Sequence, residues 1–463
     1  MIEQLRMIVG DGGVLTGDDL RTRNPGVFLS EIGADAILRP TTSEQISQIM
    51  ALCYAAGQPV VVHGGMSGWA RAVATKPGEI ALSLERMNVI EEVDVLNRTV
   101  TVQAGVILAT LQDHLEPLGL DFPLDLGGRG SCHLGGNAAT NAGGMRVLRY
   151  GMMREQILGI EVVLADGQVL SSMNRMIKNN TGYDLKQLFI GSEGTLGVIT
   201  RLVLRLRERP TSSNTALVSA SSFGQIAQLL RHMDGALGGM LSAFELVDHS
   251  FYRVNTEAGR HPAPLAADKP FYAIIETQGS DDERDLDQFE QALASALEKQ
   301  LFDDCVLARS NRERAAIWNI REDLDHIIRD FQPFYAFDVS LPVGEMEGYM
   351  IEVKRRLAAI WPDGSIAFLG HVGDGNLHVA IGAGGPGDKA RVEACVYEPL
   401  RAMIGSVSAE HGIGIDKKAW LAVSRNALER KLMQAIKHLL DPKNILNPGK
   451  IFDPEPPFSV IGN

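Results

Sequence analysis

Small residues fill the stretch Gly127-Gly128-Arg129-Gly130-Ser131-Cys132-His133-Leu134-Gly135-Gly136-Asn137-Ala138-Ala139-Thr140-Asn141-Ala142-Gly143-Gly144. Such a run cannot build a hydrophobic core, so it is either a flexible linker or backbone wrapped around an extended ligand. Linkers are rich in glycine and serine and otherwise featureless. This stretch also carries side-chain amides at Asn137 and Asn141 and hydroxyls at Ser131 and Thr140. The composition therefore favours backbone that approaches a ligand closely.

A second glycine-rich loop precedes this stretch. The capping signal Thr42-Ser43-Glu44-Gln45 predicts a helix that ends near Gly57. The apolar run Pro59-Val60-Val61-Val62 then predicts a buried strand, which leads directly into His63-Gly64-Gly65-Met66-Ser67-Gly68. A glycine-rich loop after a strand can aim its N–H groups at phosphate oxygens, because bulky side chains would block the approach. The loop has neither the GxGxxG spacing nor the Gly-Lys-Ser/Thr of a P-loop.

The chain that follows Gly144 returns to strands and turns. Glu161 to Leu164 and Val169-Leu170 predict a hairpin with a two-residue type I′ turn at Asp166-Gly167. A third run of small residues, Gly191-Ser192-Glu193-Gly194-Thr195-Leu196-Gly197, feeds a strand that extends to Leu206. Pro210-Thr211-Ser212-Ser213 is typical of a domain boundary. Short strands and helices alternate beyond it, and one helix is predicted from Arg312 to Arg329.

A pair of histidines lies on a predicted hairpin near the C-terminus, Gly370-His371-Val372-Gly373-Asp374-Gly375-Asn376-Leu377-His378-Val379. A type I′ turn at Asp374-Gly375 would place His371 opposite His378. The two imidazoles and the Asn376 amide would then share one face, with opposed Cβ atoms roughly 4.5–5.5 Å apart. That arrangement suits a divalent metal, and the alternative is a solvated hairpin that carries two histidines. Glu410 would add a carboxylate and complete a two-histidine, one-carboxylate ligand set.

Composition sets limits on the class of protein. At 463 residues the chain should form two or three domains. The formal net charge of −13 argues against nucleic acid or an anionic membrane surface as the main partner. Four scattered cysteines without CxxC spacing predict free thiols in a reducing compartment. Neither a signal peptide nor a run of roughly 20 apolar residues is present, so we expect a cytoplasmic protein without a membrane span.

Four motifs occur in order along the chain: Pro123 to Gly127 running into Gly130 to His133, Asn137 to Gly144, Asn180 to Gly197, and His371 to His378. Together they resemble the FAD-dependent D-2-hydroxy acid dehydrogenases of the vanillyl-alcohol oxidase/PCMH superfamily, with D-2-hydroxyglutarate and D-lactate dehydrogenases as the nearest groups. The resemblance runs from about Ile37 to Phe452. It implies an α+β fold with a PCMH-type FAD-binding domain of two α+β subdomains (1–210), an α+β, ferredoxin-like substrate domain carrying the histidine hairpin (211–400), and a C-terminal helical segment that returns to the flavin (401–463).

The resemblance also implies FAD as the cofactor. Some relatives attach FAD covalently through a histidine placed after the glycine pair of the first loop. Here His63 precedes that pair, and Ser67 and Gly68 lie beyond it, which favours noncovalent FAD. The expected FAD-binding residues are His63, Gly64, Gly65, Met66, Ser67, Gly68, Gly130, Ser131, Gly135, Gly136, Asn137, Thr140, Asn141, Gly144, Gly194, Gly197, Val198, Ile199 and Asn447.

Catalytic roles follow from the same resemblance. His371, His378 and Glu410 match the family's metal ligands, with zinc expected and manganese or iron as alternatives. Arg321 matches an arginine that clamps a carboxylate, because a guanidinium offers a bidentate fork. Asn376 and His411 match substrate-contacting positions. From the residues alone, Arg321 could equally pair with a surface acid and His411 could serve a helix C-terminus.

The implied reaction is oxidation of a D-2-hydroxy acid to the 2-oxo acid, with hydride transfer to flavin N5. A bound metal would lower the pKa of the hydroxyl, and a neutral His411 would accept its proton. Two positions depart from the hydroxyglutarate enzymes. Asp325 stands where they have a hydroxyl residue, and Ala336 stands where they have a lysine. These departures predict that monocarboxylic acids such as D-lactate are oxidised at least as efficiently as D-2-hydroxyglutarate.

Four other functions each fit part of the sequence. A D-2-hydroxyglutarate-specific dehydrogenase and a D-lactate-type oxidase that uses oxygen share the same machinery. A flavin-free non-haem metal enzyme would use the two histidines and the carboxylate but leaves the glycine-rich stretches unexplained. A non-catalytic flavin-binding module would not need Arg321 and His411. The sequence does not specify the electron acceptor (oxygen, quinone, electron-transfer flavoprotein or cytochrome), and it leaves a homodimer open.

Overall fold

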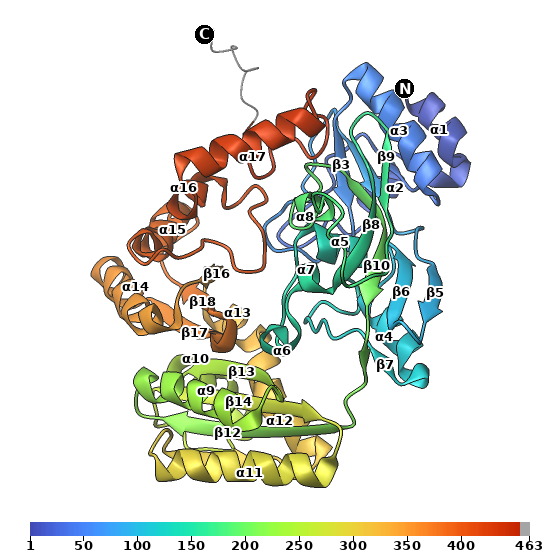
Figure 1. The fold of residues 1–463 in the computed structure, drawn as a ribbon. Helices are drawn as coiled ribbons and strands as arrows, with labels where there is room; N and C mark the ends of the chain where they lie inside the picture. Colours follow the sequence, from blue (N-terminus) through green and yellow to red (C-terminus); the bar gives the residue numbers. More distant parts are fainter. Residues whose placement is uncertain (454–463) are drawn as a thin grey trace. The chain divides into compact units, whose positions relative to one another are not determined.

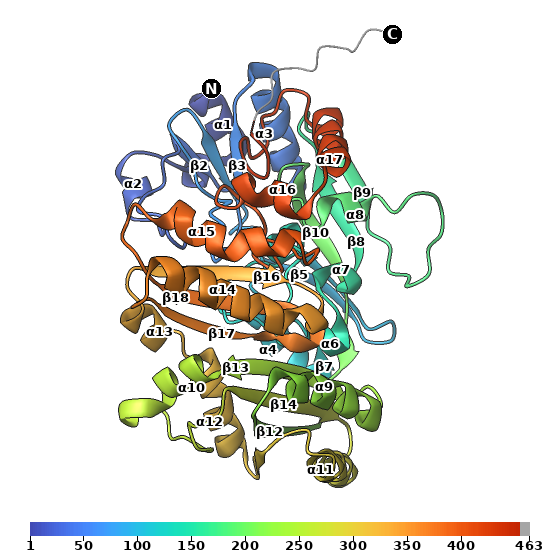
Figure 2. The same ribbon diagram turned by 90° about the vertical axis from the view of Figure 1, so that its left-hand side faces the viewer.

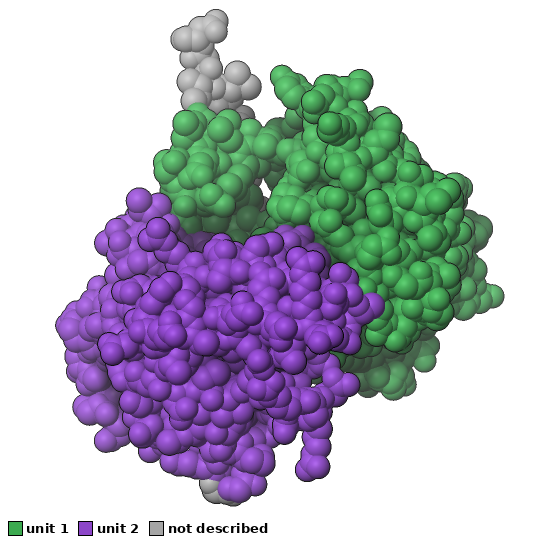
Figure 3. Space-filling model, turned by 60° about the horizontal axis from the view of Figure 1, so that its bottom comes forward, with its two compact units in different colours: residues 1–143, 152–209, 410–463 green, residues 144–151, 210–409 purple. Residues whose placement is uncertain are grey.

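The computed structural model describes residues 1–453. The chain folds as two compact units, each built from more than one segment (Figure 3). Unit 1 comprises residues 1–143, 152–209 and the segment that begins at Glu410. Unit 2 comprises residues 144–151 and 210–409. Within the described residues, no helix combines the length and the apolar character that a membrane crossing requires.

Unit 1 contains a small mixed sheet and a larger antiparallel sheet (Figure 1). The small sheet has the order β1-β2-β4-β3, and β4 pairs in parallel with both of its neighbours. The larger sheet has the order β5-β6-β10-β8-β9. The strands of unit 1 are β1 (Val14–Leu15), β2 (Ala36–Leu38), β3 (Val60–His63), β4 (Ile80–Ser83), β5 (Ile90–Asp94), β6 (Thr99–Gln103), β7 (Leu120–Asp121), β8 (Ile157–Val163), β9 (Val169–Ser172), β10 (Val198–Arg205) and β11 (Arg207–Glu208).

The predicted first long helix of unit 1 is confirmed. The side chain of Thr42 accepts a hydrogen bond from the N–H of Gln45 at the start of the helix, and Gly57 ends it with φ +66°. Its buried face, which includes Ile46 and Met50, packs in a core with strands of the small sheet. The helices of unit 1 are α1 (Ile2–Val9), α2 (Asp18–Arg21), α3 (Ser43–Ala56), α4 (Leu108–Leu115), α5 (Leu134–Ala139), α7 (Met153–Gln156), α8 (Lys186–Phe189), α16 (Leu421–Ser424) and α17 (Ala427–Leu440).

The hairpin of β8 and β9 differs from the prediction in its turn. The N–H of Leu164 donates to the carbonyl of Gln168, so three residues form the loop. Gly167 has φ +89°, whereas Asp166 is not among the residues with positive φ. A type I′ turn needs positive φ at two successive residues, so the predicted two-residue turn is wrong although the strands are correct.

Unit 2 is built on one antiparallel sheet with the order β15-β12-β14-β13-β17-β18-β16. One face packs against α10, α12 and α13 through residues such as Phe251, Ile320 and Ile327. Helix α14 lies over β17 and β18 on the opposite face (Figure 2). The strands are β12 (Ser212–Ala220), β13 (Leu241–Asp248), β14 (Phe271–Gly279), β15 (Asp304–Leu307), β16 (Phe334–Ser340), β17 (Ser365–His371) and β18 (Asn376–Gly382), and the helices are α6 (Val147–Tyr150), α9 (Phe223–Leu237), α10 (His249–Thr256), α11 (Asp282–Glu298), α12 (Asn311–Glu322), α13 (Asp325–Asp330), α14 (Met346–Ile360) and α15 (Lys389–Tyr397).

The single helix predicted from Arg312 to Arg329 is two helices. Helix α12 ends at Glu322, and α13 begins at Asp325. Asp323 takes an extended conformation at the break, and one of its carboxylate oxygens accepts a hydrogen bond from the N–H of Asp325 at 3.1 Å. A short aspartate side chain that bonds to a nearby backbone group competes with helix continuation. Asp325 therefore does not lie one turn along the helix that carries Arg321.

The histidine hairpin exists, but its predicted register is wrong. Residues 372–374 form a short 3₁₀ helix in place of a two-residue turn, and Leu369 rather than His371 pairs with His378. The shift is two residues along the strand. Because side chains alternate faces with a period of two, His371 and His378 still lie on one face. Their ring centroids are 5.4 Å apart.

Candidate functional site

Five neighbouring strands of unit 2 each place a charged or imidazole side chain on one face of the sheet. These residues are Glu276 on β14, Glu245 on β13, His371 on β17, His378 on β18 and Asp338 on β16. Glu245 pairs with His371 in the strand register, and Asp338 pairs with His378. This face is also the one covered by α10, α12 and α13, because apolar residues of the same parity pack there. The sheet therefore gathers side chains that are far apart in sequence.

Glu245 connects two of the residues predicted from the sequence. It is fully buried, and its two carboxylate oxygens contact different partners. One lies 2.6 Å from Nδ1 of His371, and the other accepts a hydrogen bond from Nε of Arg321 at 2.9 Å. Burial alone would raise the pKa of Glu245, but His371 and Arg321 outweigh burial and lower the pKa to about 2. We call Glu245, His371 and Arg321 the Glu245 cluster.

Arg321 is buried near the end of α12, with 9 % of its surface exposed. Its Nε donates to Glu245, and its two terminal nitrogens have no acceptor among residues 1–453. Trp318, one turn earlier on α12, donates its indole N–H to Glu276. Glu276 also binds Arg146, which belongs to the short segment 144–151 of this unit. The C-terminal half of α12 is therefore fixed to the sheet by polar bonds, and two guanidinium nitrogens remain for a ligand.

Asn376 is the second buried polar residue on this face without a full set of partners. Only 3 % of it is exposed, and neither its side-chain oxygen nor its side-chain nitrogen has a partner among the described residues. Asp374 precedes it in the hairpin loop, and burial raises the pKa of this carboxyl to about 6. An unpaired buried amide costs free energy, so such a group suggests a missing ligand or water.

Ala409, the last residue of unit 2, is held by Asp338, which also lies near His378. Asp338 lies 3.8 Å from Nδ1 of His378 and accepts a hydrogen bond from the N–H of Ala409 at 3.1 Å. Glu410 is the next residue in the chain and the first of the final segment of unit 1.

In unit 1, the two glycine-rich loops, residues 63–68 and 130–136, pack against each other. A Cβ on Gly65 would lie 2.1 Å from the carbonyl oxygen of Ser131. Packing between the two loops therefore requires glycine at this position, whether or not a ligand is bound. A Cβ on Gly68, Gly130 or Gly136 would meet nothing within 4 Å. The N–H groups of residues 64–68 have no acceptor among the described residues. We call these two segments the cofactor loops.

Asn447 holds the first cofactor loop from the C-terminal segment. Its side-chain oxygen accepts a hydrogen bond from Val62, and its side-chain nitrogen donates to the carbonyl of Glu193. Asn447 is 2 % exposed and has φ +43°. A Cβ on Gly194 would lie 2.8 Å from the Asn447 amide, so Gly194 is also required by packing. The structure thus joins three distant segments of the sequence at the entrance of this loop.

His411 belongs to the same unit as the cofactor loops. Its ring stacks on Trp69 with centroids 5.5 Å apart and planes at 26°. The backbone just beyond it is fixed by Glu193, whose carboxylate accepts hydrogen bonds from Ile413 and Gly414 at 2.7 Å. Burial raises the pKa of Glu193 despite these bonds. Trp69 is the next residue in the chain after the first cofactor loop. His411 therefore lies beside the end of this loop.

Two buried histidines stand beside the glycines. His63 is 3 % exposed and lies 2.9 Å from the carbonyl oxygen of Val73, and burial lowers its pKa to about 4. Burial also lowers the pKa of His133, whose Nδ1 is buried without a partner in the described chain. Burial therefore favours the neutral form of both imidazole rings.

The remaining predicted FAD-binding residues fall into three groups. Gly135 and Gly197 pack against Ala104 and Val162, respectively, at distances that exclude a side chain. The side chains of Asn137, Thr140 and Asn141 bond within unit 1, to Cys132, to the carbonyl of Gly136 and to the N–H of Arg154. Gly64 and Met66 belong to the first cofactor loop, and Ser67 of that loop lies beside Gly128. Val198 and Ile199 are buried at the start of β10, and Gly144 belongs to unit 2.

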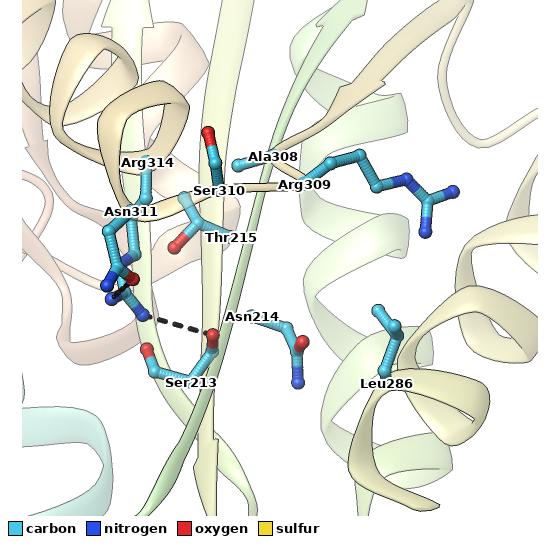
Figure 4. Close-up of a pocket in the computed structure, with 9 residues that line it drawn as sticks. All are labelled: Ser213, Asn214, Thr215, Leu286, Ala308, Arg309, Ser310, Asn311 and Arg314. Carbon is cyan, nitrogen blue, oxygen red and sulfur yellow. Dashed lines mark hydrogen bonds between the residues drawn. The ribbon is translucent and has the colours of Figure 1, made fainter. Parts of the chain in front are cut away.

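Unit 2 also has a cavity of about 160 Å³ beside the start of α12 (Figure 4). It is lined by residues that include Asn214, Thr215, Arg309 and Arg314. Arg314 donates to the carbonyl of Ser213, as the dashed line in Figure 4 indicates. None of the residues predicted from the sequence lines this cavity.

Sequence reasoning missed Glu245, because β13 was not predicted. Its signal is a single glutamate within the run Leu241-Ser242-Ala243-Phe244-Glu245-Leu246-Val247, every member of which is buried. A carboxylate buried in such a run requires a charged or hydrogen-bonded partner. The run therefore indicates a partner, and only the folded chain identifies His371 and Arg321.

Comparison with known protein families identifies the class of this protein. Residues 34–172 match the model described as "FAD binding domain", and residues 209–451 match "FAD linked oxidases, C-terminal domain". The second match covers more than half of the chain. The protein belongs to the FAD-linked oxidase family and is an FAD-dependent oxidoreductase, as its motifs predicted.

The chain belongs, within that family, with a group of curated dehydrogenases. It is 39% identical over 443 residues to the mitochondrial D-2-hydroxyglutarate dehydrogenase of Danio rerio, which covers 95% of this chain and 83% of the relative. It is 36% identical over 472 residues to the D-2-hydroxyglutarate dehydrogenase of Stutzerimonas stutzeri strain A1501, with 98% of each chain covered. Names of some relatives place them in mitochondria, so the expected cytoplasmic location stays a prediction.

Solved structures define the fold. The substrate-bound crystal structure of p-cresol methylhydroxylase matches with a TM-score of 0.77 at 18% identity, covering 98% of this chain and 96% of that chain. An alkyldihydroxyacetonephosphate synthase matches with a TM-score of 0.76 at 16% identity, covering 96% and 84%. The expected α+β fold with a PCMH-type FAD-binding domain is therefore confirmed.

Proposed function

We propose that this protein oxidises a D-2-hydroxy acid to the corresponding 2-oxo acid, with FAD as the immediate electron acceptor. The names of the relatives support the reaction, since they are D-2-hydroxyglutarate dehydrogenases at 36% to 39% identity. The observation that carries the proposal is the Glu245 cluster, in which one buried carboxylate contacts both His371 and Arg321. It orients a potential metal ligand and a potential carboxylate clamp at once.

Most of the residues proposed to hold FAD belong to unit 1. The unpaired N–H groups of residues 64–68 fit the anionic oxygens of a diphosphate, because successive amides form an anion-binding concavity. Gly130 and Gly136 leave open space, and His133 offers a buried nitrogen. When bound, FAD supplies the acceptor for the hydride. The predicted residues in the cofactor loops, together with Asn137, Thr140, Asn141, Gly144, Gly194, Gly197, Val198, Ile199 and Asn447, are proposed to line it.

The attachment of FAD would be noncovalent, because no histidine follows the Gly64-Gly65 pair in the first cofactor loop. Acid denaturation and centrifugation test this directly. The yellow colour should remain in the supernatant, and colour that stays with the pellet would contradict the proposal.

A divalent metal would be held by His371, His378 and Glu410, with zinc expected and manganese or iron as alternatives. Glu245 contacts Nδ1 of His371, as the carboxylate does in carboxylate–histidine–metal triads. When bound, the metal supplies positive charge that lowers the pKa of a coordinated hydroxyl.

The substrate itself would be held by Arg321 and Asn376. The two free guanidinium nitrogens of Arg321 match the fork of a carboxylate, and the unpaired amide of Asn376 offers both a donor and an acceptor. His411 is proposed as the base that removes the hydroxyl proton while the α-hydrogen leaves as hydride. His378→Ala should abolish turnover and leave the flavin spectrum little changed.

The substrate class is proposed to include monocarboxylic acids such as D-lactate. Ala336 is exposed and lies two residues from Asp338 on β16, on the sheet face that carries His378. It contributes no cation there for a second carboxylate. Asp325, the second departure, is exposed at the start of α13, beyond the break that separates this helix from the one that carries Arg321. A diacid therefore lacks one favourable contact that a lysine would provide.

Anaerobic flavin reduction with a panel of D- and L-2-hydroxy acids tests the proposal. We expect D-2-hydroxy acids to bleach the flavin absorption and L-isomers to leave it unchanged. Removal of metal by chelation should stop bleaching, and readdition of zinc or manganese should restore it. A protein that binds flavin but is bleached by no 2-hydroxy acid would refute the reaction, and full activity in a metal-free sample would remove the metal.

A further inference from the structure

Three side chains form a second cluster of potential metal ligands in unit 2. His261 follows α10, Asp323 stands at the break between α12 and α13, and His326 lies on α13. Nε2 of His261 lies 2.8 Å from Oδ2 of Asp323, and Nδ1 of His326 lies 3.1 Å from the same oxygen. All three are partly buried and share no residue with the Glu245 cluster. The proposed oxidation assigns them no role.

The backbone around the cluster is held by one buried residue. Asn255 is fully buried, and its side chain donates to the carbonyls of Ile320 and Asp323, both at 2.9 Å. The N–H of His261 donates back to the carbonyl of Asn255 at 3.0 Å. His261 and Asp323 are therefore positioned relative to each other before any ligand binds, which reduces the entropy that binding must overcome.

The carboxylate of Asp323 is oriented by its other oxygen. Oδ1 accepts a hydrogen bond from the N–H of Asp325 at 3.1 Å, so Oδ2 faces the two imidazoles. Metal-binding carboxylates are commonly hydrogen-bonded in this way through the oxygen that does not face the metal. Arg260, which directly precedes His261, does not pair with Asp323. It donates hydrogen bonds to Asp330 and to the carbonyl of Val254 instead.

His326 is the residue whose contacts most indicate a ligand. Its Nδ1 is buried and close to Oδ2 of Asp323, yet it is not aligned for a hydrogen bond and has no partner among the described residues. A cation in front of both atoms would satisfy them together. Tetrahedral zinc, with bonds of about 2.0–2.1 Å, separates its ligand atoms by about 3.3 Å, which is close to the two distances observed.

We propose that His261, Asp323 and His326 bind a second divalent transition metal, for which zinc is the chemical match. Two imidazole nitrogens favour zinc over calcium or magnesium, which prefer oxygen ligands. Three protein ligands leave the fourth position to water. The metal would join the loop after α10 to the break between α12 and α13. Its role is to fix the C-terminal end of α12, two residues beyond Arg321.

Zinc stoichiometry on the full-length flavoprotein tests the site. After chelation, equilibrium dialysis against zinc should give one bound zinc per chain in His378→Ala, where the other proposed site is disabled. The double variant His378→Ala/His326→Gln should bind none, and so should His378→Ala/Asp323→Asn. His378→Ala/His114→Gln is the matched control, because His114 is an exposed histidine outside both clusters, and it should keep the one zinc.

A second measurement separates binding from a folding defect. Zinc should raise the midpoint of thermal unfolding of His378→Ala and leave that of His378→Ala/His326→Gln unchanged, with equal flavin content in both. A zinc-edge anomalous peak between His261, Asp323 and His326 in zinc-soaked crystals would locate the ion. Equal zinc binding by the two proteins would overturn the proposal, and so would failure of His378→Ala to bind zinc, which would leave the cluster as a hydrogen-bonded network only.

Discussion

The cofactor loops of unit 1 and the Glu245 cluster of unit 2 illustrate two ways of building a site. The loops present backbone amides, and several of their glycines are required by contacts between the loops themselves, as Gly65 against Ser131 shows. The cluster presents charged side chains that are buried and paired, with Glu245 between His371 and Arg321. A backbone site tolerates loss of a side chain, whereas a buried charge network fails when one member is removed. The predictions below test this difference.

Arg321→Met should have the largest effect. It leaves Glu245 buried beside a single partner, and breaking such a pair costs about 3–5 kcal/mol of unfolding free energy. Turnover of every 2-hydroxy acid should also be lost with the carboxylate clamp. Urea unfolding and steady-state kinetics measure the two effects. Arg329→Met is the control, because Arg329 is an exposed arginine paired with the adjacent Asp330, and a similar loss in both variants would argue against a special role for Arg321.

Glu245→Gln should lower metal affinity or kcat/KM by about ten- to a hundredfold, the usual cost of removing a residue that orients a metal-bound histidine. Glu276→Gln provides a matched control. Glu276 is equally buried on the same sheet face but binds Arg146, Trp318 and Ser242 rather than a histidine. Glu276→Gln should lower stability and leave metal affinity unchanged. Equal loss of metal in both variants would show that buried charge in general, and not His371 orientation, controls the site.

Glu245 should also contribute to acid denaturation. The pKa of this carboxyl falls from an ordinary value of 4.5 to about 2 in the folded state. A lowered pKa means that its stabilising contribution is fully present above pH 4.5 and is lost as the pH falls toward 2. Wild type should therefore lose more unfolding free energy over this range than Glu245→Gln. The unfolding free energies come from denaturant titrations at decreasing pH. If they fall equally with pH in the two proteins, this linkage is excluded.

In the cofactor loops, Gly65→Ala should destabilise the protein by about 1–3 kcal/mol, because the added Cβ would meet the backbone of Ser131. Gly68→Ala meets nothing within 4 Å and should leave the stability of the FAD-free protein unchanged. It should nevertheless weaken FAD binding if the loop N–H groups contact the diphosphate. Thermal unfolding without FAD, followed by FAD titration, distinguishes the two. Normal FAD affinity in Gly68→Ala would count against the proposed cofactor contact.

Ala336→Lys should have the smallest effect and act on specificity alone. One new charge-assisted contact, worth about 1.5–3 kcal/mol, should raise kcat/KM for D-2-hydroxyglutarate at least tenfold relative to D-lactate. Ala336→Gln adds similar length without charge and should leave the ratio near that of wild type. If wild type already favours hydroxyglutarate tenfold, another cation serves the second carboxylate and our substrate proposal is wrong.

Motifs that are contiguous in sequence were predictable. The strand and loop from Val60 to Gly68 obey local rules of strand propensity and glycine geometry, and so does the helix capped by Thr42. For the histidine hairpin, the prediction placed both histidines on one face, which is correct, but paired the wrong residues across the two strands. Side-chain alternation depends only on residue parity, whereas register also depends on the turn, which adopts a 3₁₀ conformation at residues 372–374.

By itself, the sequence determined that the chain carries the glycine-rich motifs of an FAD-binding domain and two histidines on one face of a hairpin. Only the tertiary structure decided that Glu245, 126 residues before His371 and 76 before Arg321, contacts both of them. It likewise decided that Asn447 supports the loop after Val62 from the far end of the chain. The physical reason is that a buried carboxylate or amide must find a partner, and no local rule of propensity, spacing or alternation specifies which distant strand supplies it.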